Sequence, residues 1–268
     1  MVIREELKSF HTYTLRHVVT SCEVTPQNQM RPSYFLRMMQ EAADLDSAEL
    51  GVSRKELEAA NQLVMVSRNS IQIYRYPQAH EEIQLVTLHR SIRGVRMYRD
   101  FLFFSGDYVL AEATNEYCMV SASNRHAVRP DLYANNPNFA QQNYKPGNPQ
   151  PKRIVLPTHL LNMGNRKVYY SHLDQNGHLN NANYCDFAID ALPAVLRPMT
   201  PDFFEMNFHR EAAYQSTIQM QYGYDGEFMY IGGMQEQQFC FAMRMHFSNL
   251  PQFEYEKKIR MEGGETVQ

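Results

Sequence analysis

The chain has 268 residues, enough for one large domain or two ordinary ones, and its 44% hydrophobic and 21% charged residues are typical of a folded globular protein. Its formal net charge of −3 argues against a nucleic-acid partner, because proteins that bind nucleic acid usually present an excess of basic residues. The cysteines are scattered at Cys22, Cys118, Cys185 and Cys240. This spacing predicts free thiols rather than a zinc ribbon or a disulfide framework.

The N-terminal segment contains no apolar run of the kind found in signal peptides, and it is too acidic for a typical organellar transit peptide. No stretch approaches the roughly 20 consecutive apolar residues of a membrane-spanning helix. We therefore expect no membrane span and a cytoplasmic location, and the absence of a transit peptide leads us to expect a bacterial protein.

The first predicted element is a helix that starts at Arg31, tolerates Pro32 in its first turn and stops at Gly51. Its apolar side chains recur at helical spacing and form one stripe. They are Phe35, Met38, Met39, Ala42 and Leu45. Runs rich in Val, Ile, Tyr and Phe follow and predict strands over residues 63–76, over 83–104 and from 109 onward.

Residues 131–153 are rich in Asn, Gln and Pro. Their apolar residues show neither the helical nor the strand periodicity, so this segment is predicted to be a linker. After it, a second predicted helix begins at Asn180, and strand-like runs begin at residues 203, 217, 228 and 239. The apolar face of this second helix is predicted to contain Tyr184, Phe187, Ala188 and Ala191.

The order of one helix followed by several strands thus occurs twice, in residues 1–130 and 154–268. The segment that starts at His80 matches the one that starts at Gln215, which pairs Arg75 with Arg210. We interpret the two halves as an old duplication. The predicted fold is α+β, with a central helix wrapped by an antiparallel sheet in each half, because each helix has one apolar stripe to bury.

The segment before the second helix is unusually rich in residues that can do chemistry. On an extended chain, alternate residues point the same way, so Asp174, Asn176 and His178 are expected to share one face. Asn180 or Asn181 is expected to cap the helix. Capping accounts for one Asn but not for the three aligned polar residues before it.

The sequence LDQNGHLNNANY resembles the active-site segment of the acyl-ACP thioesterase family, which releases fatty acids from acyl carrier protein (ACP) in fatty acid biosynthesis. That family has a D-x-N-x-H-x-N-N pattern, followed about thirty residues later by R-x-x-E or R-R-E, and here HREA places Glu211 at the matching position. The resemblance covers nearly the whole chain. It implies a tandem double hot-dog fold, hydrolysis of the acyl-ACP thioester, ACP as the partner, and no cofactor or metal.

The resemblance also implies that Asp174, Asn176, His178 and Glu211 are the catalytic residues. Our hypothesis for their roles makes Glu211 the general base for a water molecule, with His178 and Asn176 orienting that water or polarising the carbonyl. Asp174 is expected to hold His178 or Asn176, and backbone N–H groups near Gly177 are expected to stabilise the oxyanion. Plant members often have a cysteine after the glutamate; here Ala212 excludes a cysteine nucleophile at that position.

The first half lacks this set of residues. With Tyr34 aligned to Tyr184, the matching positions hold residues that cannot do acid–base chemistry at neutral pH. The residues opposite Asp174, Asn176 and His178 are Val24, Pro26 and Asn28, and the match of Arg75 with Arg210 puts Tyr76 opposite Glu211. The first half is therefore expected to bind the acyl chain. Its predicted lining residues are Phe35, Met38, Met39 and Met65, because methionine adapts to flexible apolar ligands.

Several alternatives remain open at this stage. The chain could act on acyl-CoA, or bind acyl carriers without catalysis; a hot-dog dehydratase fits the downstream HRE poorly. His172, Asp174 and His178 mix suitable types for a metal site, although the family resemblance implies none. Two basic groups could dock ACP or simply be solvated. They are Arg90, Arg93, Arg96 and Arg99, and Lys152, Arg153, Arg166 and Lys167. The sequence leaves a homodimer open.

Overall fold

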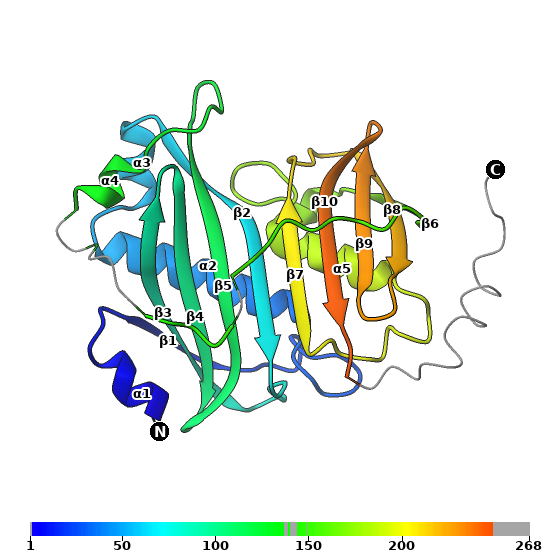
Figure 1. Ribbon diagram of the computed structural model, residues 1–268, viewed down its shortest axis with the longest axis horizontal. Helices are drawn as coiled ribbons and strands as arrows, with labels where there is room; N and C mark the ends of the chain where they lie inside the picture. Colours follow the sequence, from blue (N-terminus) through cyan, green and yellow to red (C-terminus); the bar gives the residue numbers. More distant parts are fainter. Residues whose placement is uncertain (1, 137–138, 140–143, 149, 249–268) are drawn as a thin grey trace. The chain divides into compact units, whose positions relative to one another are not determined.

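The computed structural model describes residues 2–136, 139, 144–148 and 150–248. The chain divides into two compact units, Met1–Pro151 and Lys152–Gln268 (Figure 1). Much of the segment predicted to be a linker belongs to the first unit, because it contains the short helix α4 (Asp131–Ala134) and buries Tyr133 and Tyr144. The Asn-rich and Pro-rich composition of this segment predicted a linker, but its aromatic side chains provide apolar surface that is buried in the first unit.

The first unit has a sheet in the order β1-β3-β4-β5-β2, and each neighbouring pair is antiparallel. Its helices are α1 (Val2–Leu7), α2 (Pro32–Glu49), α3 (Arg54–Ala59) and α4. Its strands are β1 (Tyr13–Val18), β2 (Gln62–Ile73), β3 (Glu82–Arg93), β4 (Arg96–Ser105) and β5 (Tyr108–Ser121). The helix from residue 31 and the strand runs from residues 63 and 109 are confirmed, and the run over 83–104 consists of two strands, β3 and β4, joined by a turn at Gly94. The elements α1, α3 and β1 had not been predicted.

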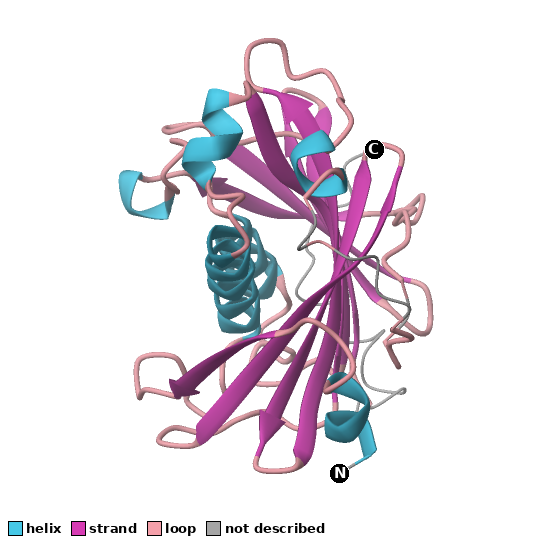
Figure 2. Ribbon diagram, turned by 90° about the vertical axis from the view of Figure 1, so that its left-hand side faces the viewer, coloured by secondary structure: helices cyan, strands magenta, loops and turns pink. Residues whose placement is uncertain are grey.

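Helix α2 lies along one face of this sheet and α1 lies on the opposite face (Figure 2). Phe35 on α2 packs edge-on against Phe103 of β4, with ring centroids 4.9 Å apart. Leu45 was predicted on the buried stripe, which is wrong: its side chain is 38% exposed. Asp46 is buried instead, because its carboxylate forms an ion pair with Arg99 of β4.

The basic run on β3 and β4 is not one solvated docking face, so that part of the prediction is wrong. Arg90 and Arg99 are buried, with Arg90 Nε 3.4 Å from Asp100 Oδ2 and Arg99 Nη1 2.5 Å from Asp46 Oδ2. Because an isolated buried charge is costly, each guanidinium has a carboxylate beside it. Arg93 and Arg96 are exposed.

His89 of β3 is another buried titratable group, and we expect it to make the protein sensitive to acid. Burial, with a smaller contribution from the nearby Arg99 charge, lowers the pKa of His89 to about 3. The unfolded chain therefore binds one more proton than the folded chain between about pH 6.5 and pH 3. The free energy of unfolding should fall as the pH drops through this window, by about 5 kcal/mol at most.

The measurement is urea unfolding of His89→Gln and wild type across that pH range. The variant, which cannot take up this proton, should show a shallower loss of stability. The exposed His126 offers a matched control, since His126→Gln should keep the wild-type slope. Equal slopes for all three proteins would show that His89 does not carry the acid sensitivity.

The second unit repeats this arrangement, with its sheet in the order β6-β8-β9-β10-β7 and antiparallel neighbours. Its helical elements are η1 (Tyr170–His172) and α5 (Asn181–Ala191). Its strands are β6 (Leu161–Lys167), β7 (Phe203–Phe208), β8 (Thr217–Tyr224), β9 (Met229–Gln235) and β10 (Gln238–His246). The predicted apolar face of α5 is buried, and β6 had not been predicted.

Backbone details show that the two units are related position by position. His80 and Gln215, which the sequence alignment paired, both have left-handed φ angles, 67° and 65°. The His80 N–H donates to the carbonyl of Val19 at 2.7 Å, and the Gln215 N–H donates to that of Val168 at 3.0 Å. This part of the alignment is confirmed.

The alignment before the helices was wrong by one residue. The bridge between Val24 and Met30 in the first unit corresponds to the bridge between Leu173 and Leu179 in the second. Tyr184 therefore corresponds to Phe35 and not to Tyr34. The first-unit residues opposite Asp174, Asn176 and His178 become Thr25, Gln27 and Gln29, while Tyr76 stays opposite Glu211. None of these four residues is an acid or base at neutral pH. The first unit therefore still lacks a counterpart of the Asp174, Asn176, His178 and Glu211 set.

Candidate active site

The polar cluster lies on a tight hairpin of the second unit. Leu173 and Leu179 form an isolated antiparallel bridge, and the Asp174 N–H donates to the carbonyl of His178 at 2.8 Å. At the tip, Gly177 has a φ of +79°, a left-handed conformation that favours glycine, and its N–H donates to the Asp174 carbonyl at 3.0 Å. The expectation of an extended segment with alternating side chains is therefore wrong here.

Asp174 holds the hairpin together. Its Oδ1 accepts the backbone N–H of Asn176 at 2.8 Å and that of His178 at 3.2 Å. Its Oδ2 accepts from Nδ2 of Asn176 at 3.4 Å. The carboxylate thus fixes the turn backbone and the Asn176 amide. It does not hold the imidazole: Nδ1 of His178 is buried and has no hydrogen-bond partner among the described residues.

Glu211 is brought to this hairpin by backbone pairing. The Leu179 N–H donates to the Ala212 carbonyl at 2.9 Å, and His178 forms a bridge with Ala213. As a result, Oε2 of Glu211 lies 3.5 Å from Nε2 of His178. The two side chains are 35% and 27% exposed, so solvent can reach both. A water molecule beside the pair is able to contact both atoms.

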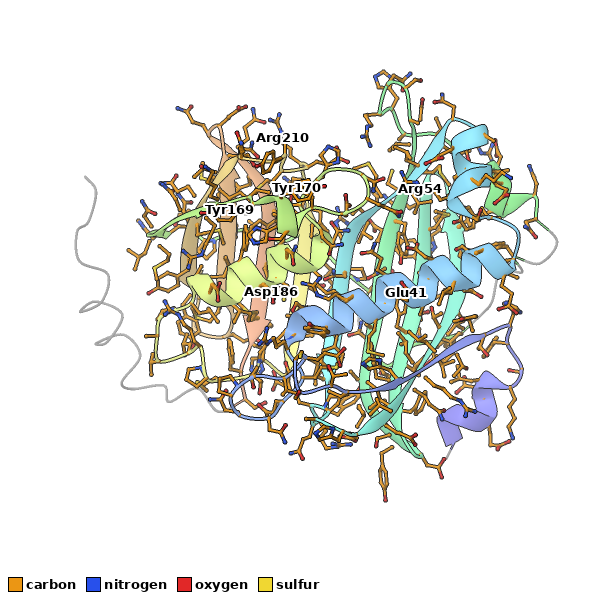
Figure 3. All side chains as sticks on the ribbon, turned by 180° about the vertical axis from the view of Figure 1, so that it is seen from behind. Glu41, Arg54, Tyr169, Tyr170, Asp186 and Arg210 are labelled. Carbon is orange, nitrogen blue, oxygen red and sulfur yellow. The ribbon has the colours of Figure 1, made fainter. Side chains whose placement is uncertain are left out.

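The start of α5 supports the hairpin from the other side. The Asn180 side chain accepts the N–H of Ala182 at 2.9 Å, so of the two predicted caps Asn180 is the one used. Nδ2 of Asn183 donates to the His172 carbonyl at 2.8 Å. Figure 3 shows Tyr170 and Arg210, the neighbour of Glu211 in sequence, on the same side of α5. The exposed rings of Tyr170 and Tyr214 are in contact, with centroids 6.2 Å apart.

The predicted oxyanion role of the Gly177 N–H does not fit this geometry, because that N–H is already donated within the turn. Gly177 instead allows the chain to reverse, so that Asn176 and His178 can occupy their places. The expected set of side chains is otherwise gathered within one hairpin and the segment that pairs with it.

Sequence reasoning missed one residue that contacts the Glu211 segment. The hydroxyl of Tyr184 accepts the N–H of Ala212 at 3.0 Å and donates to the carbonyl of Arg210 at 3.3 Å. Its place on the apolar face of α5 indicated only a core residue. Its position three residues after the N-N pair is the one feature that could have drawn attention to it.

Among the described residues, no group of three or more His, Cys, Asp or Glu side chains is arranged to hold a metal ion. His172 is occupied structurally, since its Nδ1 accepts the N–H of Tyr169 at 3.2 Å. The cysteines are free, and Cys185 is buried, as expected for a packed core thiol. Burial raises the pKa of Cys240 to about 11, which keeps that thiol protonated at neutral pH.

Comparison with known proteins decides the family. The model of the acyl-ACP thioesterase N-terminal domain matches residues 11–135, and that of the C-terminal domain matches residues 158–263. The chain belongs to the acyl-ACP thioesterase family. It is therefore a thioester hydrolase of fatty acyl-ACP, as the active-site motif predicted.

Solved structures of this kind show the same double hot-dog fold. An acyl-ACP thioesterase from Bacteroides thetaiotaomicron is 16% identical, with a TM-score of 0.81 over 88% of this chain and 98% of that one. A 12:0-ACP thioesterase from Umbellularia californica is 17% identical, with a TM-score of 0.76 over 88% and 96%. A search of curated proteins found no match. Within the described part of the thioesterase, no helix is long and apolar enough to cross a membrane.

Proposed function

We propose that this thioesterase hydrolyses fatty acyl-ACP by general-base catalysis, with Glu211 as the base. Glu211 removes a proton from a water molecule while the water oxygen bonds to the thioester carbonyl carbon. When the tetrahedral intermediate collapses, the carbon–sulfur bond breaks and the sulfur takes up the proton from Glu211. The products are a free fatty acid and the thiol form of ACP, so atoms and charge balance without a cofactor.

The observation that carries this proposal is the 3.5 Å separation between the Glu211 carboxylate and the His178 imidazole on a solvent-accessible hairpin. We assign His178 the role of orienting the water that Glu211 activates. Asn176 is exposed, and among the described residues its side-chain amide donates to Asp174 at the long distance of 3.4 Å, so the amide can turn to donate to the thioester oxygen. Asp174 keeps both residues in place through the turn backbone.

The test of this function is product analysis with a panel of acyl-ACPs of different chain lengths, beside the matching acyl-CoAs. Free fatty acid and free thiol are measured together, and equal amounts are expected. Faster turnover on ACP supports the carrier protein as the partner, whereas faster turnover on CoA supports the alternative of an acyl-CoA thioesterase. No free acid from any substrate would contradict hydrolysis and leave the non-catalytic carrier-binding module. A cytoplasmic location would place the enzyme with its carrier and suit its free cysteines.

We further propose that the acyl chain binds in the first unit, lined by Phe35, Met38, Met39 and Met65. Met65 on β2 is half-buried, so a larger side chain can be placed there at moderate cost to folding. We expect Met65→Phe to shift the released fatty acids to shorter chains, because added volume leaves less space for the terminal methylenes. Gas chromatography of the products measures the shift. Met163→Phe, a half-buried position on β6 of the second unit, is the control, and an unchanged profile for Met65→Phe would count against this binding mode.

A further inference from the structure

Tyr184 holds the backbone on both sides of Glu211. Its hydroxyl donates to the carbonyl of Arg210 at 3.3 Å and accepts the N–H of Ala212 at 3.0 Å. Arg210 and Ala212 are the immediate neighbours of Glu211, so one hydroxyl spans the residue that carries the carboxylate. A shift of this backbone would move the carboxylate relative to His178.

The Tyr184 ring is itself fixed in the core of the second unit. The side chain is buried, and its ring centroid lies 5.7 Å from that of Phe208 and 5.1 Å from that of Phe241. Phe241 fits here because Gly233 of β9 has no side chain: a Cβ there would lie 2.1 Å from the Phe241 ring. Burial raises the pKa of Tyr184 far above its ordinary value, so the hydroxyl stays protonated and able to donate.

The first unit provides a natural comparison, because it has the same backbone without the catalytic residues. Phe35 stands at the place of Tyr184, so the hydroxyl is missing. Pro77 stands at the place of Ala212, since the Met30 N–H donates to Pro77 as the Leu179 N–H donates to Ala212. Proline has no N–H to donate. The first unit, in which Tyr76 replaces the glutamate, thus lacks both the N–H donor and the hydroxyl acceptor of this hydrogen bond.

We propose that Tyr184 is a positioning residue that holds the Glu211 carboxylate against His178 and so sets the rate of thioester hydrolysis. It does not touch substrate in this role; it acts through Glu211. This inference rests on the proposed function of Glu211. If Tyr184 acts through Glu211, removing the Tyr184 hydroxyl should lower kcat only when Glu211 is present.

The first experiment compares Tyr184→Phe with wild type on one acyl-ACP. We expect kcat to fall about 10- to 100-fold with KM changed less than twofold, because a small misplacement of a catalytic group is costly while the substrate contacts remain. Tyr230→Phe is the matched control: it also removes a hydroxyl, which donates to Asp225 at 2.8 Å, and it should keep the wild-type kcat. Equal kcat for Tyr184→Phe and wild type would overturn the proposal.

A second variant reaches the same hydrogen bond without changing the core. Lactic acid incorporated at position 212 replaces the backbone N–H of Ala212 with an ester oxygen, and it should lower kcat as Tyr184→Phe does. This variant decides the question if Tyr184→Phe does not fold. Wild-type kcat in the ester variant would likewise overturn the proposal.

The third measurement separates positioning from a general structural effect. In a Glu211→Gln background, Tyr184→Phe should lower the remaining rate by less than twofold, although thermal melting still reports the lost hydrogen bond. An equal fold-loss with and without Glu211 would show a structural role only. If Glu211→Gln alone keeps the wild-type rate, the proposed function fails. If it is inactive while Tyr184→Phe is fully active, only the present inference fails.

Discussion

Glu211→Gln should lower kcat for acyl-ACP hydrolysis by about 10³-fold, within the range that a positioned general base contributes. Glutamine keeps the size and shape of the side chain beside His178 but cannot accept a proton from water. KM should stay within about threefold, because the lost interaction acts in the transition state rather than in substrate binding. Steady-state release of free thiol, with the acid measured in parallel, gives both constants.

The matched control for this variant is Glu227→Gln, which neutralises an exposed glutamate in the same unit. It should retain the wild-type kcat, so that a general effect of removing one negative charge is excluded. Circular dichroism should show that both variants are folded. A Glu211→Gln enzyme that keeps more than about one tenth of the wild-type rate would contradict its assignment as the base.

The active-site residue types could be predicted from the sequence, but their geometry could not. The motif identified Asp174 and His178 because they are close together in the chain. Their arrangement depends on Gly177, whose left-handed conformation turns the segment into a hairpin. The approach of Glu211 depends on the bridge between His178 and Ala213, which joins positions far apart in sequence. A short sequence motif does not reveal which distant segment will pair with it.

The error of one residue in the internal alignment has a physical origin as well. Two tyrosines, Tyr34 and Tyr184, suggested a match, but they lie at different positions of their helices. The equivalent positions are set by the turns that precede the helices, where Asn28 and Gly177 both have positive φ angles of 59° and 79°. Asparagine tolerates that conformation better than most residues, so the two turns have the same backbone conformation although their residue types differ.

The long helices α2 and α5 and the more apolar strands were predicted, whereas the short helices α1 and α3 and the edge strands β1 and β6 were missed. Strands β1 and β6 lie at the ends of the strand order of their own units and pair on one side only within them. Their sequences, YTLRHV and LNMGNRK, are short and rich in polar residues. Edge strands bury less apolar surface than central strands, so the hydrophobic signal that identifies a strand is weak in them.

Buried charge was the third feature that the sequence did not reveal, and it leads to the largest stability change that we predict at neutral pH. Arg99→Met should lower the free energy of unfolding by about 3–5 kcal/mol, because it leaves the Asp46 carboxylate buried without its guanidinium partner. Both side chains are almost fully buried, at 4% and 2% exposed. Urea unfolding at neutral pH measures the change.

The double variant Asp46→Leu with Arg99→Met should regain most of the lost stability, because two apolar side chains need no charge partner. Arg54→Met is the control: its exposed pair with Glu58 on α3 should be worth less than about 0.5 kcal/mol. A double variant no more stable than Arg99→Met would mean that the packing of Arg99, and not the loss of the guanidinium beside the Asp46 carboxylate, causes the loss of stability. In that case the ion pair would be a consequence of the fold in the first unit rather than a condition for burying Asp46 on α2.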